Sequence, residues 1–217
     1  LYDKEIYVER ITNLSGDLRY AGIENDLLAY INNKGRNIDS RVLALRIAES
    51  CRTNAIEGDI LNVLSDENEH IRVRKHAASF FIDSPNEDQK TELLPFVLED
   101  IPSDTDDELK GLCMAALWPE HISICQLLST IMPKKDPKLF GAYDLFINII
   151  LFEKMKRDSL NDALDWYAQH FFEFSYANSL LPKLLLKTIE QCIYHAETAP
   201  KIASLILNLY RDNCELL

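Results

Sequence analysis

Glycine is scarce in this sequence, with only six residues in a chain of 217. An all-β protein normally needs many glycine-rich turns, so this scarcity favours helices. None of the six glycines begins a GxxxxGK or GxGxxG motif, which excludes the two common phosphate-binding loops from this chain. We therefore do not expect the chain alone to hydrolyse nucleotides.

Long hydrophobic runs are also missing. No apolar stretch reaches about 18 residues, the length at which a membrane-spanning helix becomes a candidate, and no secretory signal is present. The cysteines are odd in number and never spaced as CxxC; they are Cys51, Cys113, Cys125, Cys192 and Cys214. This pattern is typical of reduced thiols in a cytoplasmic protein rather than of a disulfide framework. We expect a cytoplasmic protein that does not contact a membrane.

Motifs for catalysis or metal binding are absent as well. The five histidines form no HExxH motif and no Cys/His set with zinc spacing. Cys192 and His195 are three residues apart, like a nucleophile and its base, but Cys192 falls in an apolar stripe typical of a buried, inert thiol. The acidic residues at 104–108 lack the glycine and distal glutamate of an EF-hand, and the start of a helix explains them better. We expect no catalytic, cofactor-binding or metal site.

The charge balance is acidic, with 35 acidic and 23 basic side chains and a net charge of −12. Such a surface repels phosphate backbones unless its basic residues gather on one face, so nucleic acid is a disfavoured partner. Equivalent positions of a repeat protein do line up along one surface, and eight basic residues could gather in this way. This candidate partner-binding ridge comprises Arg41, Arg46, Arg52, Arg72, Arg74, Lys75, Lys134 and Lys135. The alternative interpretation is a solvated face whose charges pair with neighbouring Asp and Glu.

Helical periodicity recurs along the chain. Three basic residues, Arg41, Arg74 and Lys110, are spaced 33 and 36 residues apart. Three residues after each comes a small side chain, and seven residues after each comes an apolar one; these are Ala44, Ala77 and Cys113, then Ala48, Phe81 and Leu117. A second apolar doublet follows each anchor: Ile60–Leu61, Leu93–Leu94 and Leu127–Leu128. A period of about 35 residues with two helices per unit is typical of an α-solenoid.

The segment DDELKGLCMAALWPEHIS, residues 106–123, has the features of a repeat boundary. Ser103 or Asp104 is expected to cap a helix whose first turn is acidic, and Pro119 is expected to end it. Ser123 then begins the partner helix, and Ser40 is the expected cap of the helix through residue 51. Further helices are expected at about 139–155, 160–173, 178–195 and 199–215.

Two resemblances follow from these residues. RVLALRIAE and IRVRKHAASF resemble HEAT-type repeats, over roughly residues 40–132. The 106–123 segment, LLSTIMPKKDPKLFGAYDLFI and ALDWYAQH together resemble a helical region that follows the nucleotide-binding module of bacterial NACHT- or STAND-type ATPases. The motifs that carry this second resemblance are Trp118-Pro119, Pro133-Lys134-Lys135 and Gly141-Ala142-Tyr143. It implies a sensor or regulatory arm of an antiviral defence protein whose ATPase and effector parts lie outside this chain.

The sequence therefore predicts an all-α protein, an α-solenoid of HEAT-like antiparallel helical pairs. Residues 1–217 are expected to form one helical-repeat domain, clearest over 40–132 and looser over 139–217, and to be a piece of a longer protein. The predicted function is a non-catalytic scaffold that binds another protein or another domain of the same chain. The alternatives are a nucleic-acid-binding repeat that uses the basic ridge, and an enzyme whose site is assembled from distant residues.

Overall fold

The computed structural model describes residues 18–138, 140–175 and 178–214. The described residues fold into helices joined by turns and loops, and they contain no strand. The all-α class expected from the scarce glycines and the helical periodicity is confirmed. No helix within the described ranges combines the length and apolar character needed to cross a bilayer.

The chain divides into two compact units. The first unit comprises the residues up to Leu117 together with Gly141–Tyr143. The second comprises Trp118–Phe140 and the residues from Asp144 onward. The division falls at the Trp-Pro boundary that the sequence marks.

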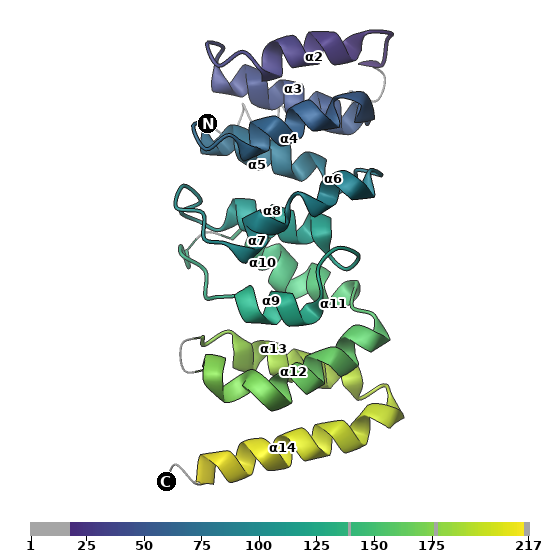
Figure 1. Cartoon of the computed structure of the whole chain (residues 1–217), viewed down its shortest axis with the longest axis vertical. Helices are drawn as coiled ribbons and strands as arrows, with labels where there is room; N and C mark the ends of the chain where they lie inside the picture. Colours follow the sequence, from purple (N-terminus) through teal and green to yellow (C-terminus); the bar gives the residue numbers. More distant parts are fainter. Residues whose placement is uncertain (1–17, 139, 176–177, 215–217) are drawn as a thin grey trace. The chain divides into compact units, whose positions relative to one another are not determined.

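The first unit is built from two rows of packed helices (Figure 1). Helix α3 packs against α2 and α5, and α5 packs in turn against α4 and α8, so that α3, α5 and α8 form one continuous row. Helices α2, α4 and α6 contact one another in sequence on the other side. The bounds are α2 Ile23–Ile31, α3 Ile38–Cys51, α4 Glu57–Ser65, α5 Ile71–Phe80, α6 Glu87–Thr91, α7 Leu94–Leu98 and α8 Glu108–Leu117, with a 3-10 turn η2 at Asn54–Ile56.

The recurrent positions of the sequence lie in the interior of this packing. The small residues Ala44, Ala77 and Cys113, on α3, α5 and α8, are all buried. Four residues further along, Ala48, Phe81 and Leu117 have no exposed surface at all. Small side chains at the same place on neighbouring helices let the helix axes approach closely, which is why the recurrence at intervals of 33 and 36 residues is visible in the sequence.

The helix starts agree with the sequence in part. Asn37, rather than the expected Ser40, caps α3: its side chain accepts a hydrogen bond from the Asp39 backbone N–H. The Asp104 carboxylate accepts the backbone N–H groups of Leu109 and Lys110, as its expected capping role requires. However, α8 begins only at Glu108, so the preceding acidic residues lie outside the first turn.

Gly111 permits a close approach within the first unit. A Cβ atom at this position would lie 2.3 Å from the backbone nitrogen of Tyr143, well inside van der Waals contact. The same approach brings the Ala142 backbone N–H to 2.9 Å from the Glu108 carboxylate, to which it donates a hydrogen bond. Gly141–Tyr143 therefore packs against α8 because position 111 has no side chain.

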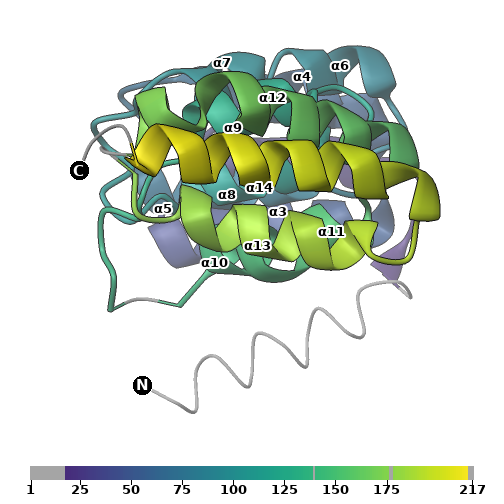
Figure 2. The same ribbon diagram turned by 90° about the horizontal axis from the view of Figure 1, so that it is seen from below.

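The second unit is organised around α12, Arg157–Ser175, which packs against α9, α13 and α14 (Figure 2). Its other elements are α9 Ile124–Thr130, the π-helical turn η3 Phe146–Ile150, α11 Leu151–Glu153, α13 Leu181–Cys192, the 3-10 turn η4 Ala196–Thr198 and α14 Ala199–Cys214. The short helix α10, Ala142–Leu145, is divided between the two units after Tyr143. Ser123 caps α9 in a capping box with Gln126, as expected. The Trp166 indole N–H donates to the Ser129 hydroxyl at 3.0 Å, which fixes α12 on α9.

Candidate functional site

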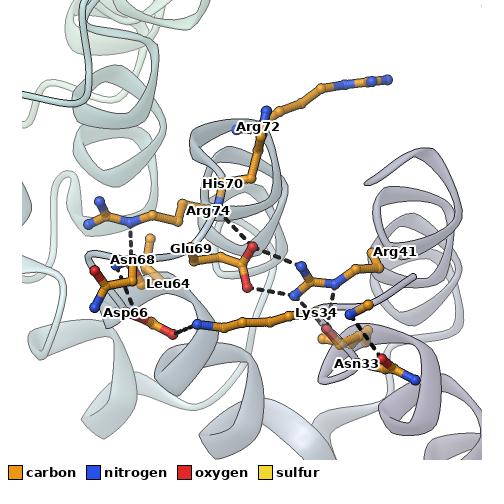
Figure 3. A network of polar contacts seen from close by, with 12 residues as sticks. Asn33, Lys34, Arg41, Leu64, Asp66, Asn68, Glu69, His70, Arg72 and Arg74 are labelled. Carbon is orange, nitrogen blue, oxygen red and sulfur yellow. Dashed lines mark hydrogen bonds and ion pairs between the residues drawn. The ribbon is translucent and has the colours of Figure 1, made fainter. Parts of the chain in front are cut away.

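The proposed basic ridge does not form as the sequence suggested, because its two anchors are internal. Arg41 and Arg74 are only 2% and 3% exposed. Both lie near the N-terminus of a helix in the row formed by α3, α5 and α8: Arg41 is in α3 and Arg74 is in α5. A surface ridge that includes them is therefore wrong. The two arginines instead form a repeated buried motif, shown in Figure 3.

Arg41 is held by one carbonyl and one carboxylate. Its Nε and one Nη donate to the carbonyl oxygen of Ile31 at 2.9 and 2.7 Å, at the last residue of α2. Its two Nη atoms donate to the two oxygens of Glu69 at 2.8 and 2.6 Å. The side chains of both partners are 3% exposed. This is a bidentate, fork-to-fork pair, the geometry in which a guanidinium binds a carboxylate best.

Glu69 is ionised by its surroundings despite its burial. Burial opposes ionisation, but hydrogen bonds from Arg41 and from the His70 backbone N–H outweigh it, so the pKa of Glu69 lies below its ordinary value. Glu69 comes directly before His70, the residue that caps α5 through its ring nitrogen. The pair therefore joins α3, the end of α2 and the start of α5 through one desolvated ionic contact.

Arg74 repeats the first half of this arrangement 33 residues later. Its Nε donates to the carbonyl oxygen of Leu64 at 2.8 Å, and Leu64 precedes it by ten residues, as Ile31 precedes Arg41. The second half differs: one Nη donates to the Ser103 hydroxyl at 3.1 Å, and Arg74 makes no ion pair with the described residues. Figure 3 shows the Arg74 guanidinium pointing away from Glu69, which faces Arg41.

Arg74 lines a pocket of about 470 Å³ within the first unit. Phe96 supplies an apolar wall, with its ring centroid 5.9 Å from the guanidinium carbon. Pro95, Ile101 and Pro102 also line the pocket, and its acidic residues are Glu67, Glu99 and Asp100. The site thus combines a buried cation, apolar walls and carboxylates at solvent-exposed positions.

The remaining ridge residues of the first unit do not form one basic surface, because two of them pair with aspartates and Arg52 lies at the end of α3. Arg72 pairs with Asp39 and Lys75 pairs with Asp106, each joining two successive repeats. Arg46 and Arg72 lie near His76, and burial together with these two cations lowers the pKa of His76 to about 4. Arg52 stands apart at the end of α3, in a left-handed conformation with φ of 50°, and lines a separate pocket of about 440 Å³.

The two ridge lysines of the second unit differ from each other. Lys134 forms an ion pair with Asp144 and is largely buried, whereas Lys135 is exposed. Most of the eight residues are therefore buried or ion-paired. Four of them each contact a residue of a neighbouring repeat; these are Arg41, Arg72, Arg74 and Lys75.

The other candidate chemistry of the sequence is structural. Cys192 is fully buried, and burial raises the pKa of its thiol, so it is not a poised nucleophile. His195 is partly exposed and lies 3.7 Å from the Glu197 carboxylate. Among the described residues, no three His, Cys, Asp or Glu side chains converge as metal ligands would.

A second feature, which the sequence analysis did not single out, is an exposed apolar stripe on α14. Leu205 is buried on one side of this helix, yet Ile206, Leu207 and Tyr210 are 51%, 67% and 70% exposed on the other. Ala203, one helical turn before Leu207, is exposed as well. Spacings of three, four and seven residues place these four on one face. The signal was available in the sequence, because residues 202–210 are apolar around most of the helix.

Comparison with known proteins returned no significant match to any family model, curated protein or solved structure.

Proposed function

We propose that this chain is a non-catalytic protein-interaction scaffold, built as a HEAT-like α-solenoid, which binds another protein or another domain of its own chain. We further propose that it acts in the cytoplasm as the sensor or regulatory arm of a larger bacterial NTPase of the NACHT or STAND type. The recurrence of the arginine-to-carbonyl contact at a 33-residue interval supports the repeat architecture.

The exposed stripe of α14 is the observation that supports protein binding. A helix with apolar side chains on opposite faces is typical of one that is covered on both. Exposed clusters of large apolar residues mark interaction surfaces on soluble domains, and tyrosine is enriched at their energetic centres. The exposed face of α14, Ala203, Ile206, Leu207 and Tyr210, therefore suits the apolar side of an amphipathic partner helix.

The basic residues argue against the alternative, a nucleic-acid-binding repeat. Two of the eight are buried and three are in ion pairs with aspartates, so few are left to neutralise phosphates. The net charge of −12 adds a repulsive background.

The experiment places a photo-crosslinking amino acid at Leu207 and captures partners from host lysate, with and without nuclease. The captured protein is then purified, and its affinity is measured for the wild type and for Leu207→Glu. We expect capture to survive nuclease, and Leu207→Glu to weaken binding about tenfold or more, since it places a charge in an apolar contact.

Ser204→Glu is the matched control, because it adds the same charge at an exposed position of α14 outside the stripe. It should leave the affinity within about twofold of wild type. Equal binding by Leu207→Glu and wild type, or loss of all captured material on nuclease treatment, would contradict the proposed function.

A further inference from the structure

The pocket at Arg74 has the form of an ion-pair site with one partner missing. At Arg41 the carbonyl of Ile31 and the carboxylate of Glu69 together satisfy the guanidinium. At Arg74 the carbonyl of Leu64 is in the equivalent place, but the carboxylate is replaced by a serine hydroxyl. Glu69 lies 28 residues after Arg41, and the residue 28 after Arg74 is Pro102.

The burial of Arg74 makes this replacement significant. A guanidinium carries five N–H donors and remains ionised in proteins. Among the described residues, two of these five donors have an acceptor, the Leu64 carbonyl and the Ser103 hydroxyl, and both acceptors are neutral. A charge that is 97% removed from solvent is stable only when an anion or several hydrogen bonds compensate for the lost hydration. Arg74 also lines the adjoining pocket of about 470 Å³.

The acidic residues of the pocket narrow the chemistry of the ligand. Glu67, Glu99 and Asp100 occupy exposed positions around it. They would repel a dianion such as phosphate, but they complement a positive group close to a single carboxylate. The apolar walls of Pro95, Phe96 and Pro102 suit the aliphatic stem of a side chain.

We propose that the Arg74 pocket binds an acidic side chain of a partner protein, an Asp or Glu with a Lys or Arg beside it. The carboxylate accepts hydrogen bonds from the Nη atoms of Arg74 as Glu69 does from Arg41, and the neighbouring cation meets Glu67 or Glu99. The inference rests on the proposed protein-binding function, because the ligand belongs to a partner protein. It adds to that function a second contact, in a different unit from the α14 stripe.

The test is a titration of the whole chain followed by NMR of the arginine side-chain N–H groups. The probe is the capped dipeptide acetyl-Glu-Lys-amide, with acetyl-Gln-Lys-amide and inorganic phosphate as comparisons at constant ionic strength. We expect the Glu probe to shift the Arg74 resonance saturably, and the Gln probe to bind at least about tenfold more weakly. The Arg41 resonance is an internal control and should stay in place, because Glu69 already occupies that guanidinium.

Pro102→Glu and Pro102→Gln form a matched pair that tests the same idea without a ligand. Pro102 is exposed and follows Arg74 by 28 residues, the same interval at which Glu69 follows Arg41. The Glu variant should supply the missing carboxylate, raise the melting temperature by a few °C relative to the Gln variant, and abolish the response of Arg74 to the probe.

Three outcomes would overturn the proposal: no shift of Arg74 with the Glu probe, phosphate binding at least as tightly as that probe, or equal melting temperatures for the two Pro102 variants. These outcomes are independent of the α14 experiment. Titration and melting report on the pocket alone, whereas cross-linked capture at Leu207 reports on the proposed function.

Discussion

Removal of the Glu69 carboxylate should destabilise the protein substantially. Glu69→Gln keeps the size of the side chain but leaves the Arg41 guanidinium, which is 2% exposed, without a counter-ion. Breaking a buried ion pair from one side costs about 3–5 kcal/mol, and we expect the lower end because the Gln carbonyl still accepts one hydrogen bond. For a chain of this size, about 3 kcal/mol corresponds to a fall in melting temperature of roughly 6–12 °C.

The assay is thermal unfolding by circular dichroism at pH 7, with hydrogen exchange to localise the effect to the first unit. Asp39→Asn is the control, because it removes an ion pair with Arg72 whose side chains are 63% and 53% exposed. An exposed pair contributes about 0–1 kcal/mol, so this variant should melt within about 3 °C of wild type. A double-mutant cycle of Arg41→Met with Glu69→Gln should show that the double variant loses less stability than the two single variants added together.

The ion pair between Arg41 and Glu69 should also make the stability of the fold depend on pH. The pKa of Glu69 is lower in the folded chain than its unfolded value of about 4.3. The stabilisation is therefore complete above that pH and is lost as the pH falls through the folded pKa. The gap in melting temperature between wild type and Glu69→Gln should narrow below about pH 4. A variant that melts within about 1 °C of wild type at pH 7 would refute this account of the buried pair.

Two further predictions concern α5. Ala77 has no exposed surface, so Ala77→Glu should overpack the interior and bury a charge, and it should lower the free energy of unfolding by about 3 kcal/mol or more. An unchanged urea midpoint would show that Ala77 does not lie in a packed interior. Burial and the charges of Arg46 and Arg72 lower the pKa of His76 to about 4 in the folded chain, against about 6.5 in the unfolded chain. Between about pH 6.5 and pH 4 the unfolded chain therefore binds more protons than the folded chain, so the free energy of unfolding falls as the pH drops through this range. We expect that loss to be about 1–2 kcal/mol, since partial exposure screens the charge, and His76→Gln should abolish it; an equal slope in variant and wild type would assign the effect to another group.

The basic anchors show how sequence reasoning can find a position and mistake its role. Arg41 and Arg74 were recognised because they recur at a fixed interval, and that recurrence is confirmed as a recurring contact with a helix-terminal carbonyl. They were assigned to the surface because charged side chains are almost never fully buried unless paired. The pairing partner of Arg41 is 28 residues away in the sequence, and nothing in the local pattern connects the two.

The sequence by itself determined the helical class, some of the places where helices begin and end, and the small residues at which they pack. These features depend on interactions over a few residues: the periodicity of apolar side chains, the cap at Ser123 and the break at Pro119. Only the tertiary structure decided that Glu69 neutralises Arg41, that Arg74 meets the Ser103 hydroxyl, and that one face of α14 is exposed. Burial and ion pairing depend on which distant segments meet, and composition and spacing do not encode that directly.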